Sequence, residues 1–348
     1  MSSTMSPRLP PTWFRRVVLA PAVVALAAVL VWTIPLYLLA IVALGLIPKV
    51  GRAVRVLGVL VIYLVLEGAL LVSLLGLWII SGFGWRIHSP WFRAAHYRLT
   101  AWILRVLFTY VDWSLRLSIR YYGDFGTTQG HGDRPQVLAS RHAGPGDSFT
   151  LIHSLLNAFH RNPRIVLKDT LQWDPAIDVL MNRLSMVFLQ PTSFTDSRNP
   201  QRGARSVDRI AAMSAAMEDR DTLIVFPEGG NFTQGRRLAR IKQLTEDGHD
   251  DHAEMAAGMT NVLAPRPGGL FAAIDAQPDA GVVFVAHTGL DKFESLGEIW
   301  KALPIEKTLH VKGWYVPPED IPATYTDRVD WLYHWWRKID AWIDADLR

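Results

Sequence analysis

The hydrophobic pattern divides the chain into an apolar N-terminal part and a longer part in which short apolar runs alternate with helical patterns. Residues 17–47 contain no charged side chain, and residues 56–80 contain only Glu67. Each run exceeds the roughly 20 residues that an α-helix needs to cross a hydrocarbon core. A short basic turn at residues 49–52 joins the runs. The pattern therefore predicts a two-helix transmembrane hairpin, in which Glu67 is buried against a partner such as an arginine of the following segment.

Residues 91–120 mix aromatic and aliphatic side chains with arginines. Trp102 and Trp113 interleave with Arg98, Arg105 and Arg116. This pattern is typical of a helix that lies in the lipid headgroup region with its arginine stems extended toward water. A helix packed on the following domain fits the pattern equally well. Either arrangement would hold the rest of the chain at the bilayer.

After a polar loop at residues 123–135, strand-like runs alternate with helical patterns. Strands are predicted near residues 136–140, 164–167, 186–189, 222–226, 282–286 and 308–316. Helices are predicted near residues 148–160, 175–184, 203–219, 268–276 and 324–346. Such alternation predicts an α/β fold with a mixed, largely parallel sheet flanked by helices. The expected organisation is a transmembrane hairpin over residues 1–85, interfacial amphipathic helices over residues 86–130 and one α/β domain over residues 131–348.

Composition supports a membrane protein and excludes several other classes. Of the 348 residues, 50% are hydrophobic and only 20% are charged, and the mean hydropathy is +0.14, which is more apolar than an ordinary soluble enzyme. The net charge of +4 arises in the N-terminal eighty residues, so a basic nucleic-acid-binding domain is excluded. The chain has no cysteine, and it therefore has no disulfide, thiolate nucleophile or Cys-ligated metal.

The distribution of basic residues predicts the orientation. The tail and the segment after the second apolar run contain more basic residues than the turn between the runs. The positive-inside rule then places the large C-terminal part in the cytoplasm. Arginine is far commoner than lysine, and alanine, proline and tryptophan are abundant. This usage indicates a bacterium with a GC-rich genome and hence its plasma membrane.

The most informative polar pattern follows the predicted strand at residues 136–140. The strand runs into His142, a tight Gly-Pro-Gly turn and Asp147, which can cap the next helix. The turn would fold the carboxylate back onto the imidazole Nδ1 and leave Nε2 free as a base. Without a cysteine or a serine in a G-x-S-x-G setting, the pair suits activation of a substrate hydroxyl. On spacing alone, however, a His–Asp clasp that merely holds a loop is the commoner explanation.

A second polar pattern follows the predicted strand at residues 222–226. Glu228 is followed there by Gly229 and Gly230, which let the backbone approach a ligand closely. A plain strand-to-loop corner is the alternative. Functional residues of a parallel sheet gather at the carboxyl ends of its strands, so both patterns are expected at one edge. His287 follows a third predicted strand, and we expect it to have a structural hydrogen bond, although it can approach the site.

Taken together, the two patterns resemble the lysophospholipid and glycerolipid acyltransferase family. The resemblance rests on His142-x4-Asp147 and on the later sequence that runs from Phe226 to Gly229, and it extends over most of residues 136–345. It implies that His142 deprotonates the free hydroxyl of a lysophospholipid, which attacks the thioester of acyl-CoA or acyl-carrier-protein. Asp147 would orient the imidazole and stabilise its charged form. No cofactor is implied beyond this acyl donor.

The resemblance also implies substrate-binding residues. Glu228, Gly229 and Gly230 would form part of the acceptor pocket, and Lys168, just after a strand, would bind the acceptor phosphate. The polar cluster at residues 247–252 contains histidines and carboxylates, but an exposed acidic loop is expected there rather than a metal site.

Within the two motifs, two positions depart from the family pattern. Arg141 precedes the histidine where the family usually has asparagine, and Asn231 stands where the family usually has a phosphate-binding arginine. Arg236 and Arg237 lie near enough in the sequence to compensate. The acceptor phosphate is therefore less well supported than acyl transfer itself.

The sequence thus predicts an integral membrane acyltransferase that converts lysophosphatidic acid to phosphatidic acid, with no nucleic-acid partner. Another lysolipid or a glycolipid as acceptor is the nearest alternative. A non-catalytic membrane lipid-binding protein, in which His142 and Asp147 only clasp a loop, is an alternative of a different class. A hydrolase that uses the same pair on water is a third.

Overall fold

The computed structural model describes residues 9–44, 48–127, 132–144, 146–184, 186–189, 200–289 and 307–347. These residues form two compact units. The first contains residues 9–44, 48–117, 167–184 and 186–189, and the second contains residues 118–127, 132–144, 146–166, 200–289 and 307–347.

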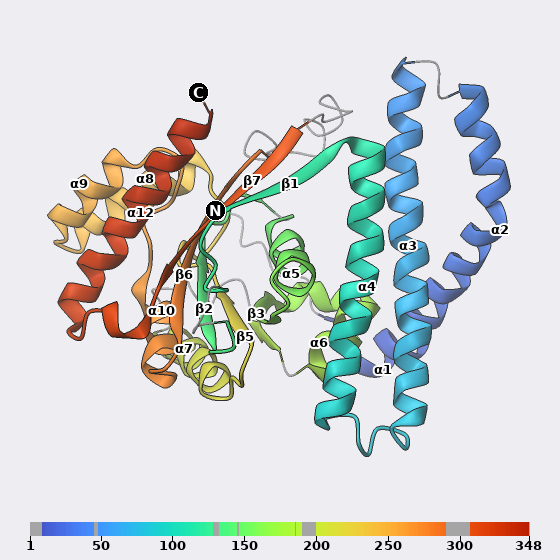
Figure 1. Cartoon of the computed structure of the whole chain (residues 1–348), viewed down its shortest axis with the longest axis horizontal. Helices are drawn as coiled ribbons and strands as arrows, with labels where there is room; N and C mark the ends of the chain where they lie inside the picture. Colours follow the sequence, from blue (N-terminus) through green and yellow to red (C-terminus); the bar gives the residue numbers. More distant parts are fainter. Residues whose placement is uncertain are drawn as a thin grey trace. The chain divides into compact units, whose positions relative to one another are not determined.

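Three long helices dominate the first unit (Figure 1). A short helix α1 (Thr12–Phe14) and a π-helical turn η1 (Arg15–Leu19) lead into α2 (Ala20–Leu44), which is followed by α3 (Pro48–Ile80) and α4 (Pro90–Leu115). The unit also contains a 3-10 turn η2 (Asp169–Trp173), helix α6 (Pro175–Arg183) and strand β4 (Val187–Leu189). By length and composition, Thr12–Leu39 and Ala53–Ile80 could each cross a membrane. The two predicted apolar helices are therefore confirmed as candidate spans.

The predicted turn at residues 49–52 is wrong, because these residues lie in the first turn of α3. Pro48 occupies the first helical position, where its ring favours the helical φ and its missing N–H is not needed. Glu67 lies buried beside Asp174, not beside the arginine that we expected. The hydroxyl of Tyr63 donates to the same Asp174 carboxylate at 2.5 Å.

Helix α4 packs along α3 and exposes a face on which tryptophan and arginine alternate. Its buried face includes Phe92, His96 and Ile103. The exposed side chains include Trp91, Arg98, Trp102, Arg105, Trp113 and Arg116. The helix ends at Leu115 because Arg116 adopts the left-handed conformation, with φ 53°. The predicted helix over residues 91–120 is thus wrong at its end, where residues 117–123 form a strand.

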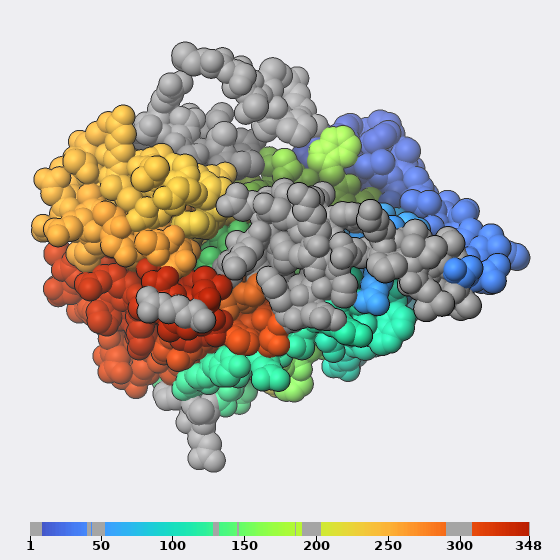
Figure 2. All heavy atoms as spheres, turned by 90° about the horizontal axis from the view of Figure 1, so that it is seen from above, coloured from blue at the N-terminus to red at the C-terminus, as the bar shows by residue number. Residues whose placement is uncertain are grey.

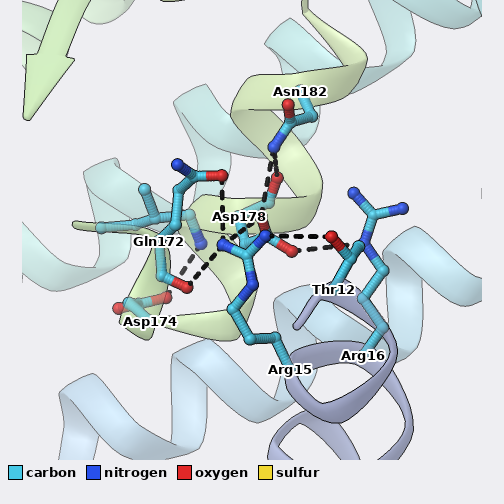
Figure 3. Close-up of polar contacts among 8 residues, drawn as sticks. Thr12, Arg15, Arg16, Gln172, Asp174, Asp178 and Asn182 are labelled. Carbon is cyan, nitrogen blue, oxygen red and sulfur yellow. Dashed lines mark hydrogen bonds and ion pairs between the residues drawn. The ribbon is translucent and has the colours of Figure 1, made fainter. Parts of the chain in front are cut away.

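A buried ion pair fastens the start of the N-terminal helix to α6 within the first unit (Figure 3). Arg15 Nη1 lies 3.0 Å from Asp178 Oδ1, and Arg16 Nε lies 3.2 Å from Asp178 Oδ2. The Arg15 guanidinium also donates to the side-chain oxygen of Gln172 at 3.1 Å. The side chain of Asp178 is fully buried and that of Arg15 is 8% exposed. Each charge therefore depends on the other for its compensation.

One sheet forms the centre of the second unit. Six of its strands are β1 (Leu117–Gly123), β2 (Gln136–Ser140), β3 (Asn162–Lys168), β5 (Asp221–Val225), β6 (Gly281–Thr288) and β7 (Lys307–Val316). They lie in the order β1-β7-β6-β2-β5-β3. Strand β2 pairs in parallel with β5 and β6, β3 pairs in parallel with β5, and β7 is antiparallel to β6. The predicted mixed, largely parallel sheet is confirmed.

Helices cover this sheet, so every residue of β2, β5 and β6 is buried. The helices are α5 (Asp147–Asn157), α7 (Pro200–Ala215), α8 (Gln234–Glu246), α9 (Asp250–Gly258), α10 (Pro267–Ala276) and α12 (Tyr325–Leu347), with a 3-10 turn η4 (Pro318–Asp320). Helix α12, red in Figures 1 and 2, packs on β6 and α9. Phe284 of β6 contacts the rings of Trp331, Trp335 and Trp336. These tryptophans thus pack against the sheet.

The sequence pattern missed α8 and α9. An exposed acidic loop was expected at residues 247–252, but only residues 247–249 connect the two helices, and Asp250 begins α9. Both helices carry few large apolar residues, so neither contains the apolar run that marks the other elements in the sequence.

The first prediction concerns the buried ion pair. Replacing Asp178 by Asn leaves the Arg15 guanidinium buried without its counter-charge, which typically costs about 3–5 kcal/mol. We expect a matching loss in the free energy of unfolding of the detergent-solubilised protein. The control is Glu246→Gln, which disrupts the exposed ion pair with Lys242 and should change stability by less than about 0.5 kcal/mol. Equal stability of both variants would contradict a structural role for the buried pair.

Candidate active site

His142 and Asp147 meet at the carboxyl end of β2. The strand ends at Ser140, the chain turns back, and Asp147 begins α5. His142 Nδ1 lies 3.0 Å from Asp147 Oδ2, so the expected contact is present. Because a carboxylate can only accept a hydrogen bond, His142 Nδ1 carries the hydrogen and donates it to Asp147, and the lone pair of Nε2 stays available. The His142 side chain is 13% exposed and that of Asp147 is 3% exposed.

The loop after β5 is bound to His142 through the backbone. Glu228 Oε1 accepts the His142 N–H at 3.3 Å, and the Phe232 N–H donates to the His142 carbonyl at 2.7 Å. The His142 ring stacks on Phe226, with ring centroids 4.3 Å apart and planes 24° apart. The two polar patterns of the sequence therefore form one site.

Asp147 is held as a carboxylate. Burial alone would raise its pKa, but three neighbours lower the pKa below its ordinary value. They are the charge of His287, the hydrogen bond from His142 and the backbone N–H of Gly144, which donates to Oδ2 at 2.8 Å. The ionised carboxylate can stabilise an imidazolium on His142 during proton transfer.

The pKa of Glu228 is shifted in the opposite direction, upward. Complete burial raises the pKa of Glu228 to about 8, although the charge of Arg141 and the backbone N–H groups of Leu263 and His142 lower it in part. Its Oε2 has no hydrogen-bond partner among the described residues. Near pH 7 Glu228 is therefore mainly a neutral acid whose hydroxyl can donate to a bound substrate oxygen.

Two arginines border the glycines that follow Glu228. Gly229 has φ +70°, which favours glycine, and a Cβ there would lie 3.4 Å from Arg266 Cδ. A Cβ on Gly230 would lie 3.1 Å from Arg236 Nη1, and that atom donates to the Asn231 carbonyl at 2.9 Å. Two arginine side chains thus lie against the backbone of this corner and give it positive charge.

Arg266 was not singled out by sequence reasoning, because it lies far along the chain from the two motifs. Its N–H donates to the Pro227 carbonyl at 2.8 Å, which joins its segment to the loop after β5. The pKa of Arg266 is lowered, first by burial and then by the charge of Arg240. Arg237, which lies near enough in the sequence to compensate for Asn231, instead donates to the carbonyls of Met259 and Ala257 at 2.5 and 2.6 Å.

Arg141 and His287 also belong to this region. Arg141 is buried, and its Nη1 donates to the His287 carbonyl at 2.8 Å. His287 is buried too, with Nε2 3.7 Å from Asp147 Oδ2. Lys168 is exposed at the end of β3 in the first unit, and its role as a phosphate ligand stays a prediction.

The second unit thus presents a histidine base, paired with a carboxylate, at the carboxyl ends of parallel strands in an α/β fold. Residues 120–287 match the family model described as Acyltransferase. This part of the chain is therefore similar to the acyltransferase family, as the motifs around His142 and Glu228 predicted.

Comparison with solved structures finds the crystal structure of the 1-acyl-sn-glycerophosphate (LPA) acyltransferase PlsC from Thermotoga maritima. The similarity covers 80% of this chain and 98% of that one, with 12% sequence identity and a TM-score of 0.44. No sequence among the curated proteins matches this chain.

The second prediction follows from the pKa of Glu228. Below about pH 4.5 the Glu228 carboxyl is protonated in both the folded and the unfolded state. Between about pH 4.5 and about pH 8 the unfolded state loses this proton while the folded state keeps it. The free energy of unfolding therefore falls as the pH rises, by up to about 1.4 kcal/mol per pH unit. Glu228→Gln lacks this proton. We expect its stability relative to wild type to increase across that window and to level off above it, as measured by urea unfolding from pH 5 to 9. A difference that does not vary with pH would contradict the raised pKa.

Proposed function

We propose that this protein is a membrane-bound acyltransferase that transfers a fatty acyl chain from acyl-CoA or acyl-carrier-protein to lysophosphatidic acid, which yields phosphatidic acid. The observation that carries the proposal is the 3.0 Å contact between His142 Nδ1 and Asp147 in a domain that is similar to the acyltransferase family. It leaves Nε2 as the nitrogen able to accept a proton from a substrate hydroxyl.

In the proposed reaction, His142 Nε2 takes the proton of the acceptor hydroxyl as its oxygen attacks the thioester carbonyl. The tetrahedral intermediate collapses with cleavage of the C–S bond, and the imidazolium returns the proton to the leaving thiolate. The products are an ester and a free thiol. Asp147 stabilises the imidazolium, and general-base catalysis of this kind typically contributes about 10²–10⁴-fold in rate.

Glu228 has a supporting role in this proposal. As a buried neutral acid with an unused Oε2, it can donate a hydrogen bond to an oxygen of the acceptor. Gly229 and Gly230 let the acceptor approach the backbone. Both features fit a pocket that orients a hydroxyl toward His142.

Arg236 and Arg266 are our candidates for binding the acceptor phosphate in place of the arginine missing at Asn231. A guanidinium offers two parallel N–H donors to a phosphate, and both arginines border the glycines beside Glu228. Lys168 is a third candidate. Because Asn231 departs from the family pattern, another lysolipid or a glycolipid is the alternative acceptor.

Two features support membrane attachment. The first is the pair of apolar helices, Thr12–Leu39 and Ala53–Ile80, and the second is the exposed tryptophan–arginine face of α4. Such a face suits the headgroup region, where tryptophan rings and arginine stems both find apolar and polar surroundings. We propose that the protein is integral to a bacterial plasma membrane, with its catalytic domain in the cytoplasm.

The third prediction tests the reaction. Detergent-solubilised protein should transfer labelled palmitate from palmitoyl-CoA, or from the acyl-carrier-protein ester, to lysophosphatidic acid. His142→Ala should lower kcat by about 10²–10⁴-fold with little change in melting temperature, because the imidazole is partly exposed. If His142 only clasped the loop, the variant would lose stability instead. Fatty acid release without acceptor would indicate a hydrolase.

Matched acceptors identify the head group. Lysophosphatidylglycerol, lysophosphatidylinositol and monoacylglycerol should be poorer acceptors than lysophosphatidic acid. Arg236→Ala should raise KM for lysophosphatidic acid and leave KM for monoacylglycerol unchanged, since the latter has no phosphate. Transfer only to another acceptor would retain the mechanism and overturn the substrate.

The fourth prediction tests the orientation and uses the absence of cysteine from the chain. Lys242→Cys introduces an exposed thiol in α8, and Ala43→Cys introduces one near the end of α2. In intact bacterial cells, a membrane-impermeant maleimide should label Cys at position 43 and should label position 242 only after permeabilisation. Labelling of both positions in intact cells would contradict a cytoplasmic catalytic domain.

A further inference from the structure

A second histidine approaches Asp147 from the neighbouring strand. His287 belongs to β6, which lies beside β2 in the sheet. Its Nε2 lies 3.4 Å from the Arg141 carbonyl and 3.7 Å from Asp147 Oδ2. The first contact is within hydrogen-bond distance, so this nitrogen donates to the Arg141 carbonyl, whereas the second is an ion-pair contact that is longer than a hydrogen bond. Asp147 is therefore approached by imidazole rings from two different strands.

The position of His287 is fixed by Arg141. Arg141 Nη1 donates to the His287 carbonyl at 2.8 Å, and the Arg141 N–H donates to the Val285 carbonyl at 3.3 Å, which extends the pairing of β2 with β6. A buried guanidinium thus holds the backbone of His287 against the residue that precedes His142. Because these hydrogen bonds join the end of β2 to β6, the pairing of the two strands fixes the distance between His287 and Asp147.

Substrate does not reach His287 through the cavity beside it. That cavity has a volume of only about 10 Å³ and is lined by Asp147, Thr150, Leu151, His287, Leu309 and Val311. Its size suits at most one water molecule, not a glycerol or an acyl chain. His287 can therefore act on the reaction through the groups that it contacts, which are Asp147 and the Arg141 carbonyl.

We infer that His287 is a positioning residue for acyl transfer: its imidazole, anchored on the Arg141 carbonyl, lies at ion-pair distance from Asp147 and holds that carboxylate in the orientation that serves His142. The inference rests on the proposed function. The Gly144 N–H and His142 Nδ1–H donate to the Oδ2 atom of Asp147, and the His287 ring adds a third polar contact to the same atom. A carboxylate held in this way keeps its charge in spite of burial and can rotate away from His142 only by losing these contacts.

The titratable groups that interact with this carboxylate come from three strands. His142 follows β2, Glu228 follows β5 and His287 belongs to β6, whereas Arg141 interacts with Glu228. Strand β7 contributes the apolar Leu309 and Val311 to the cavity, whereas its His310 pairs with Asp346.

Removal of the His287 imidazole should shift the pH profile of the reaction in a defined direction. Without His287, the Asp147 carboxylate interacts more strongly with His142, and the imidazolium form of His142 is stabilised. The acid limb of the pH profile of kcat/KM should move to higher pH. Since the His142 imidazole is also less firmly oriented, kcat should fall by about tenfold, which corresponds to about 1.4 kcal/mol of transition-state stabilisation, while KM for donor and acceptor should not change.

The fifth prediction compares four variants of the full-length, detergent-solubilised protein: His287→Ala, His287→Gln, His310→Ala and His142→Ala. His287→Ala should show the loss in kcat and the shifted acid limb. His287→Gln, whose amide N–H can replace the donor, should recover most of kcat. His310→Ala removes an imidazole–carboxylate contact from the adjacent strand and should leave the profile as in wild type.

The outcomes separate the two proposals. Activity retained by His142→Ala would overturn the proposed function. Loss of activity in His142→Ala combined with an unshifted profile in His287→Ala would overturn only the role of His287. An equal fall in kcat for the Ala and Gln variants would also contradict it. Melting temperatures are measured for every variant, and if His287→Ala fails to fold, His287→Leu, which also lacks the imidazole but fills more of its space, replaces it in the comparison with His287→Gln.

Discussion

The parallel pairing of β2 with β5 on one side and with β6 on the other is the interaction on which the site depends. The register pairs Ala139 with Val225 and Ser140 with Val285. Three strands that run in the same direction therefore end at one edge of the sheet. Those three ends carry His142, Glu228 and His287. The strand pairing itself therefore brings together residues that are far apart in the sequence. Complete burial of the strands keeps this register from slipping.

Burial sets a second constraint, because several ionisable groups share the interior behind His142. The protein compensates them in different ways. Asp147 remains charged since polar groups from the loop after β2 and from β6 surround it, whereas burial of Glu228 outweighs its donors and favours the protonated form. Two carboxyl groups at one site thus take different protonation states near pH 7, and this difference is what lets one support a base and the other donate a hydrogen bond.

The contacts of Arg141 and the surroundings of Asn231 explain how the fold accommodates these two departures from the family pattern. Arg141, which replaces the usual asparagine, turns inward, braces β6 through the His287 carbonyl and lowers the cost of charge on Glu228. Asn231 removes a cation from the loop after β5, but Arg236 and Arg266 border that loop from α8 and from the segment before α10. The positive charge beside the glycines comes from other elements than the family pattern suggests.

The sequence by itself determined the two apolar helices, the alternation of strands and helices and the pairing of His142 with Asp147. Each of these depends on local periodicity or on a short turn, which neighbouring residues specify. It could not reveal β1, which continues a helical pattern until Arg116 adopts a left-handed conformation, nor the weakly apolar α8 and α9. Only the tertiary structure decided that Glu67 faces Asp174, that Arg266 borders Gly229 and that His287 reaches Asp147. Those contacts join segments from separate strands and helices, and their free energy depends on burial and distance, which no linear pattern contains.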